Sequence, residues 1–224
     1  MKSDLIRRVP IFATLSDAEF HSLQGIFLIR SFRRNQVIFL EEETGKYMYI
    51  VLAGKIKVTK TTPEGKETVL AIHQPGDFFG EMALLDGKTA PATVSAMEDC
   101  RVATVSGSDF QNYLMRNEKV VKQIIQVLCS RLRQVWAQVH SLSYSTADAR
   151  IRGTLLQLSR RHGVPDARGI IIDLKITHQE LAGMVGTSRE TVSRTLAKLQ
   201  RDGILQIDGR RIILRDPKAL LPVT

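Results

Sequence analysis

The sequence predicts an α+β protein in which an antiparallel β-domain comes first, a long helix second, and a small domain of helices with a β-hairpin last. Three observations support this order. Short β-branched segments separated by turn residues fill 32–105, an apolar seven-residue repeat follows, and two capped helices then precede a hairpin signal. A length of 224 residues is sufficient for two domains.

A short helix is expected before the strands, over 15–26, where Ser16 and Asp17 can cap its start. The strand segments that follow are separated by turn sequences such as PEGK, QPGD and LDGK. They are QVIFL, MYIVLAG, KIKVTKT, ETVLAIH, ATVSAM and CRVATVS. Short strands at this spacing favour an antiparallel sandwich or barrel.

An apolar heptad repeat follows the strands. Leu114, Val121, Leu128, Val135 and Leu142 fall seven residues apart, and Ile125, Leu132 and Val139 lie four residues after three of them. Glu118 interrupts the second series. Because so narrow a stripe is typical of helices that pair knobs-into-holes, we expect a homodimeric coiled coil. The alternative is a helix that lies on its own domain, which would need a broader apolar face.

The segment LSYSTADAR is expected to end the long helix, because Ser, Thr and Asp compete for helical hydrogen bonds and can cap a new helix. Beyond it, 149–161 has helical spacing and 169–174 (GIIIDL) is typical of a strand. From Arg150 onward 14 Lys and Arg face 7 Asp and Glu, a net charge of +7, whereas the first 149 residues hold 18 against 16, a net charge of +2. A basic C-terminal third indicates a nucleic-acid-binding domain, with a merely solvated surface as the alternative.

Residues 177–200, THQELAGMVGTSRETVSRTLAKLQ, predict a helix-turn-helix. Two capping boxes, Thr177 with Glu180 and Thr187 with Glu190, would start two short helices, with Gly186 at the turn between them. Small or apolar residues would form the inner face: Leu181, Ala182, Val185, Val192, Leu196 and Leu199.

The outer side of the second helix carries side chains suited to DNA: Arg189, Glu190, Ser193 and Arg194. A helix-turn-helix presents this side to base edges in the major groove. Arginine can bond bidentately to guanine, and glutamate can accept from cytosine. Residues near the helix starts are expected to contact phosphates: Thr177, Gln179, Ser188 and Thr191.

A hairpin signal follows in DGILQIDGRRIILRD, where Asp208–Gly209 separates two alternating apolar runs. A hairpin directly after a helix-turn-helix is a wing. An ordinary helical hairpin with solvated arginines is the alternative, and the caps, the turn glycine and the wing argue against it. We therefore expect this segment to bind double-stranded DNA.

From about Val9 to Asp216 the chain resembles the catabolite activator (CRP/FNR) family of bacterial transcription regulators. The motifs SRETVSR and GDFFGEMALL carry the resemblance most specifically. It implies a sensory β-roll of the cyclic-nucleotide-binding type at 1–110 and a dimerisation helix at 111–142. A hinge at 143–149 and a C-terminal winged helix-turn-helix at 150–224 would follow.

The resemblance also implies what the protein contacts. Arg189, Glu190 and Arg194 would read TGTGA-like half-sites of a palindrome, one helical turn apart for a two-fold dimer. Contact with RNA polymerase, and hence activation, is implied too. The N-terminus MKSDLIRRVPIF lacks the apolar core of a secretory signal, and no apolar run approaches the roughly 18 residues of a membrane span. We expect a cytoplasmic protein with no membrane partner.

The stretch FFGEMALLDGKTAPATV raises the question of the ligand. In family members that bind cyclic AMP, the residues matching Gly80, Glu81 and Met82 meet the phosphate and ribose. The arginine and hydroxyl residue that bind the cyclic phosphate fall here on Ala90 and Pro91, and proline has no backbone N–H. Lys88 and Thr89, just before them, are the candidates to compensate, although lysine lacks the planar fork of arginine.

The adenine-contacting pair of those family members matches Val135 and Trp136. Trp136 is either a packing anchor or a stacking surface for an aromatic ligand. Each lost hydrogen bond to a charged group removes about 1.5–3 kcal/mol. We therefore expect an unknown small effector, not cyclic AMP bound in the usual mode, and no certain cofactor.

The sequence argues against other classes of protein. Cys100 and Cys129 are too few for a four-cysteine iron–sulfur cluster, and His73 is better explained as a structural histidine than as a haem ligand. An enzyme of the cupin kind would need clustered histidines, and only His21 and His73 precede the long helix. No nucleophile–base constellation indicates an enzyme. The open alternative is a regulator of the same fold without a small ligand, constitutively DNA-binding or controlled by abundance or a protein partner.

Overall fold

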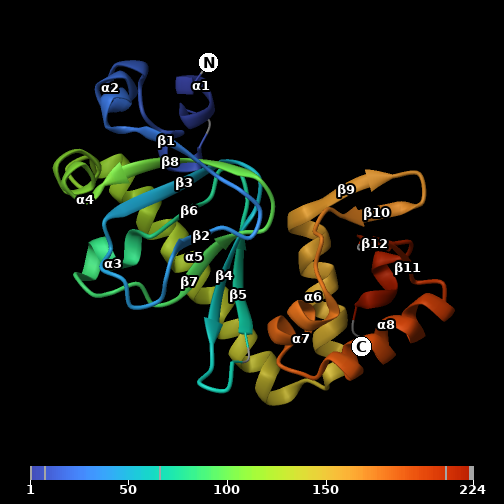
Figure 1. Ribbon diagram of the computed structural model, residues 1–224. Coiled ribbons are helices and arrows are strands. Elements are labelled where there is room, and N and C mark those ends of the chain that lie inside the picture. The colour runs from blue at the N-terminus through green and yellow to red at the C-terminus, as the bar shows by residue number, and fades with distance from the viewer. Residues whose placement is uncertain (1, 8, 66, 210, 222–224) are drawn as a thin grey trace. The chain divides into compact units, whose positions relative to one another are not determined.

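The computed structural model describes residues 2–7, 9–65, 67–209 and 211–221 (Figure 1). The chain divides into two compact units. The first runs to Arg133 apart from Gly65–Val69, and the second contains Gly65–Val69 and the chain from Gln134 onward. Each unit combines helices with antiparallel sheet, which confirms the α+β class. Within the described ranges, no helix is long and apolar enough to cross a membrane.

The β-roll consists of two four-stranded sheets, ordered β1-β8-β3-β6 and β2-β7-β4-β5. Their strands are β1 (Leu28–Phe32), β2 (Val37–Phe39), β3 (Tyr47–Ala53), β4 (Ile56–Thr61), β5 (Glu67–His73), β6 (Phe78–Phe79), β7 (Thr93–Ala96) and β8 (Cys100–Ser106). Strand β1 pairs antiparallel with β8, with Leu28 opposite Thr104. Strand β1 was not predicted, because Arg30 and Ser31 interrupt the alternation of apolar and polar residues.

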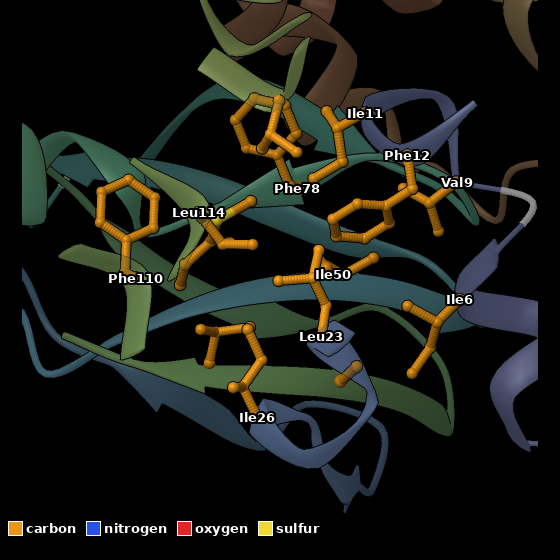
Figure 2. Close-up of a cluster of buried hydrophobic side chains, with 14 of the residues drawn as sticks. Ile6, Val9, Ile11, Phe12, Leu23, Ile26, Ile50, Phe78, Phe110 and Leu114 are labelled. Atoms are coloured by element: carbon orange, nitrogen blue, oxygen red, sulfur yellow. The ribbon is translucent and has the colours of Figure 1, made fainter. Parts of the chain in front are cut away.

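Strand β3 supplies both cores of the first unit, because successive side chains point to opposite faces of a sheet. Ile50 lies in a cluster with Phe12, Phe78 and Phe110, and Figure 2 shows these side chains gathered together. Its neighbour Tyr49 lies in the second cluster, with Phe79, Val94 and Val102 among its members.

Short helices complete the first cluster: α1 (Lys2–Arg7), η1 (Pro10–Phe12), α2 (Asp17–Leu23) and η2 (Gln24–Ile26). The predicted helix over 15–26 is confirmed. Its start is a capping box, in which the Ser16 backbone N–H donates to Glu19 Oε2 at 2.6 Å and the Glu19 N–H donates to Ser16 Oγ at 3.3 Å.

The long helix α5 spans Glu118–Tyr144, after the short turns α4 (Gly107–Asp109) and η3 (Phe110–Leu114). The predicted heptad series is therefore wrong at Leu114, which lies in η3 and is fully buried in the first unit. Asn117 separates the two elements, because its Oδ1 accepts from the N–H groups of Lys119 and Val120 at 3.1 and 3.2 Å. These bonds cap the start of α5 at Glu118, four residues beyond Leu114.

The second unit begins its own helices with α6 (Ala147–His162), where Thr146 Oγ1 accepts from the Ala149 N–H at 3.3 Å. Helices α7 (His178–Val185) and α8 (Arg189–Arg201) follow, and η4 (Pro217–Leu220) comes last. The sheet has the order β11-β12-β10-β9, built from β9 (Gly163–Asp166), β10 (Gly169–Ile172), β11 (Leu205–Asp208) and β12 (Arg211–Leu214). The expected strand at 169–174 is β10, whereas β9 was missed because Gly163 and Pro165 are poor strand formers.

Candidate DNA-binding surface and effector pocket

Helices α7 and α8 form the predicted helix-turn-helix. The first capping box is present: the Thr177 N–H donates to Glu180 Oε2 at 2.9 Å, and the Glu180 N–H donates to Thr177 Oγ1 at 3.1 Å. Gly186 ends α7 in the left-handed region with a φ of 69°. The predicted inner face is confirmed, since each of its side chains is 2% exposed or less: Leu181, Ala182, Val185, Val192, Leu196 and Leu199.

The second capping box is not formed as predicted. The Thr187 N–H donates to the Ala182 carbonyl at 3.1 Å, so Thr187 still belongs to the turn that closes α7. Ser188 is the extended N-cap instead, and its Oγ accepts from the Thr191 N–H at 3.2 Å. Glu190 is therefore left on the outer side of α8. A hydrogen bond from its own backbone N–H and one from Ser188 hold the pKa of this carboxyl below its ordinary value.

The structure places the expected base-reading residues along one side of α8. Arg189, Glu190 and Arg194 are exposed, and Ser193 is half-buried. Arg189 and Ser193, like Glu190 and Arg194, are four residues apart and lie on the same helix face. The expected phosphate contacts are near the helix starts, with Thr177, Gln179 and Ser188 exposed and Thr191 half-buried.

A residue that the sequence analysis did not select joins this surface. His178, the first residue of α7, has its Nδ1 at 2.8 Å from Ser193 Oγ. No spacing rule within one helix links positions fifteen residues apart, so the sequence held no signal for this pair.

The wing is the hairpin of β11 and β12. Asp208 pairs with Arg211, and Gly209 lies in the turn with a φ of 60°. Arg168, from the turn between β9 and β10, donates to Asp166 at 2.8 Å and to Asp208 at 3.2 Å. Arg168 thus joins the two hairpins at their tips, although exposed ion pairs contribute little stability.

A cavity of about 400 Å³ lies in the first unit, lined by both sheets, α3 (Glu81–Asp86) and α5. One wall is a stack of nearly parallel rings. Tyr49 lies 4.9 Å from Phe79 at 6°, and His73 lies 5.6 Å from Phe79 at 10°. Burial raises the pKa of the Tyr49 hydroxyl, and the positive charge of Arg30 opposes that shift. The wall is therefore aromatic and largely buried.

The cavity also holds a buried ion pair. Arg131 of α5 lies 2.8 Å from Glu81, whose side chain is 2% exposed, and it donates to the Phe78 carbonyl as well. Burial raises the pKa of the Glu81 carboxyl, while the charge of Arg131 and its hydrogen bond act in the opposite direction. A second cation, Arg30, lies over the Tyr47 ring at 4.4 Å from its centroid.

The predicted pocket residues separate into two groups. Gly80, Glu81, Met82 and Ala90 line the cavity, as does Pro91. Lys88 and Thr89 are not among the lining residues. The Ala90 N–H donates to the Glu43 carbonyl and the Glu42 N–H donates to the Ala90 carbonyl, both at 2.8 Å, so the chain turns inward only at Ala90.

Val135 and Trp136 also lie outside the set of lining residues. They belong to the second unit, with exposed fractions of 52% and 63%. The two arginines that line the cavity, Arg30 and Arg131, were not predicted. They come from β1 and α5, roughly a hundred positions apart, and only the folded sheets bring them to one cavity.

Known proteins match both halves of this structure. Residues 29–117 match the cyclic nucleotide-binding domain, and residues 149–223 match the Crp-like helix-turn-helix domain. The cyclic AMP receptor protein of Thermus thermophilus is 31% identical over 94% of each chain.

Solved structures agree with these matches. FixK2 from Bradyrhizobium japonicum superposes with a TM-score of 0.77 at 28% identity, over 87% of this chain and 96% of that one. The c-di-GMP responsive global regulator CLP of Xanthomonas campestris gives 0.76 at 26% identity, over 89% and 99%. With the helix-turn-helix and β-roll described above, these matches show that the chain belongs to the CRP/FNR family of transcription regulators and is not an enzyme.

Proposed function

We propose that the protein regulates transcription as a homodimer that binds palindromic DNA with TGTGA-like half-sites, and that its β-roll pocket binds a small effector. The observation that carries the proposal is the division of α8 into two sides. Val192, Leu196 and Leu199 are fully buried, whereas Arg189 and Arg194 are exposed. Those exposed side chains have the chemistry of base readout.

The apolar stripe of α5 supports the homodimer. Five of its residues are about half exposed in the single chain: Ile125 54%, Leu132 49%, Val135 52%, Val139 55% and Leu142 46%. Their spacing suits a second copy of the same helix. In the proposal, 1–110 is the sensory domain, 143–149 the hinge and 150–224 the DNA-binding domain. The dimerisation helix is the part of 111–142 that lies in α5, from Glu118 onward.

The effector proposal rests on the cations of the cavity. Segment 88–91 contributes none, because Ala90 and Pro91 are its lining residues. Arg131 is engaged by Glu81, so Arg30 and Lys46 remain to meet an anionic group. Such a ligand would place its apolar part against the ring stack of Tyr49. The names of the Thermus protein and of CLP refer to different nucleotides, which supports a pocket that the family adapts to more than one ligand.

The remaining parts of the proposal follow from the family resemblance alone. They are contact with RNA polymerase, activation of transcription, and action in the cytoplasm.

The first experiment measures binding of the purified full chain to a TGTGA-type palindrome, with and without cyclic AMP, at fixed salt. We expect less than a tenfold change, that is, less than about 1.4 kcal/mol of coupling. A larger increase would contradict the proposed effector mode. If the ligand-free protein binds fully and native mass spectrometry finds no bound ligand, the regulator without a small ligand is the better description.

The homodimer has its own test. Leu132→Glu places a charge in the apolar stripe, and we expect sedimentation to show monomers at micromolar concentration with DNA affinity at least tenfold lower. Ala137→Glu is the matched control, because Ala137 is exposed five positions further along α5, on the side away from the stripe. A Leu132→Glu variant that remains dimeric would exclude this stripe as the interface.

A further inference from the structure

The contact between His178 and Ser193 joins the start of α7 to the DNA-facing side of α8. The two atoms, His178 Nδ1 and Ser193 Oγ, are 2.8 Å apart, and both residues are half-buried. The inner face of the helix-turn-helix is apolar and fully packed without them. Ser193 lies beside the exposed Arg194, where a side chain meets the major groove. The pair therefore belongs to the binding surface more than to the core.

A serine hydroxyl that is not held can serve two opposite roles. It has one donor and two acceptor positions and rotates freely, so it accepts hydrogen bonds from base donors or donates to base acceptors. In the major groove the donors are the amino groups of adenine and cytosine, and the acceptors belong to guanine, adenine and thymine. An unheld Ser193 would therefore discriminate poorly between base pairs.

The imidazole restricts these roles. Where Nδ1 accepts the hydroxyl proton, Ser193 Oγ has only lone pairs left for the base, so Ser193 acts as an acceptor alone. Where Nδ1 carries a proton and donates it to Oγ, one lone pair is occupied, and the hydroxyl keeps its own proton and its second lone pair. In both tautomers the contact limits rotation of the hydroxyl and therefore fixes the directions in which Ser193 can bond a base.

We propose that His178 is a specificity-determining residue of the DNA-binding surface, and that it acts by holding the Ser193 hydroxyl and touches no base itself. This inference rests on the proposed DNA-binding function. It assigns to α7 a part in sequence readout, in addition to its phosphate contacts.

The test measures binding of the full-length protein to a set of palindromes in which each half-site position carries all four base pairs in turn. Ser193→Ala identifies the position that Ser193 reads. We expect His178→Ala to reduce the preference at that same position by about three- to tenfold, the range of one hydrogen bond, and to leave the other positions unchanged. The double variant should lose no more preference than Ser193→Ala alone, because the two residues act as one unit.

Two further variants separate this role from others. His178→Asn keeps an amide near the place of Nδ1, with both a donor and an acceptor, and we expect it to restore most of the preference. Gln179→Ala, at the next position of α7, should weaken binding to all sequences alike, as a phosphate contact does. Equal unfolding midpoints for the variants exclude a folding defect.

The outcomes are distinct. A uniform loss of affinity for all sequences in His178→Ala would make His178 a phosphate contact. An unchanged base preference in either single variant would overturn the proposal that His178 holds Ser193 for base readout. If the wild-type protein shows no preference among any of the palindromes, the proposed function itself fails, which is a different result.

Discussion

The recognition surface and the effector pocket use their charged residues in opposite ways. On α8, Arg189 and Arg194 face solvent, so they carry no cost of burial and are available to a partner. In the pocket, Glu81 is almost fully buried and faces Arg131 at 2.8 Å. A buried charge is tolerable only with a partner, whereas an exposed charge needs none. The charges of the surface are therefore open to a partner, while Glu81 and Arg131 of the pocket already hold each other.

The largest expected effect is on stability, from loss of the ion pair in the pocket. Arg131→Ala removes the partner of Glu81, and we expect the free energy of unfolding to fall by about 3 kcal/mol, the lower end for a broken buried pair because Arg131 is partly exposed. Urea unfolding at neutral pH measures it. Arg133→Ala, an exposed neighbour on α5, should change stability by less than about 0.5 kcal/mol. Similar losses in both variants would contradict a special role for the pair.

The pH dependence of stability tests the effect of burying Glu81. Burial raises the pKa of Glu81 above its unfolded value, so the folded protein binds this proton more tightly than the unfolded chain. Stability should then decline as pH rises from about 4.5, the unfolded value, through the raised folded pKa. Glu81→Gln should remove this decline, measured as unfolding midpoints from pH 4 to 7. A variant with the same slope as wild type would assign the decline to other groups.

A smaller effect is expected on the recognition side. Arg189→Ala should weaken binding to the specific palindrome by about 1–3 kcal/mol per half-site, the range of a bidentate base contact. Fluorescence anisotropy at fixed salt compares this loss with the loss on a scrambled duplex, which should be much smaller. Arg116→Ala, an exposed arginine of the first unit, controls for the charge. Equal losses on both duplexes would make Arg189 a backbone contact.

The smallest effect tests how α8 starts. Ser188→Ala removes the observed N-cap and should lower stability by about 1 kcal/mol, whereas Thr187→Ala should change it by a few tenths at most. Thermal unfolding of the two variants distinguishes them. A larger loss of stability in Thr187→Ala than in Ser188→Ala would support the capping box of Thr187 and Glu190 that was predicted from the sequence.

The same contrast explains which parts could be predicted from the sequence. The helix-turn-helix lies within 24 residues, where caps, turn glycine and apolar spacing obey local rules, so its inner face was predicted correctly. The one local error, Thr187 for Ser188, arose because two hydroxyl residues stand side by side and only the turn geometry selects between them. The heptad series was wrongly extended to Leu114 for a similar reason. Apolar spacing alone does not show that Asn117 caps the start of the helix.

The pocket follows no local rule. Arg30 and Arg131 reach it from β1 and α5, and Tyr49 stacks on Phe79 across paired strands. Lys88 and Thr89, next in sequence to lining residues, lie outside it because the backbone bonds of Ala90 set where the chain turns inward. Proximity along the chain was therefore a poor guide to proximity in the cavity.

The division of α8 into a buried side and an exposed side has a consequence for how such a protein changes its targets over generations. The residues that fold the helix are different from those that face the groove, so substitutions at Arg189, Glu190 or Arg194 cost the fold almost nothing. New operator preferences are therefore accessible by single mutations without an intermediate that fails to fold. Ser193 is the exception, because a useful change there has to be matched at His178.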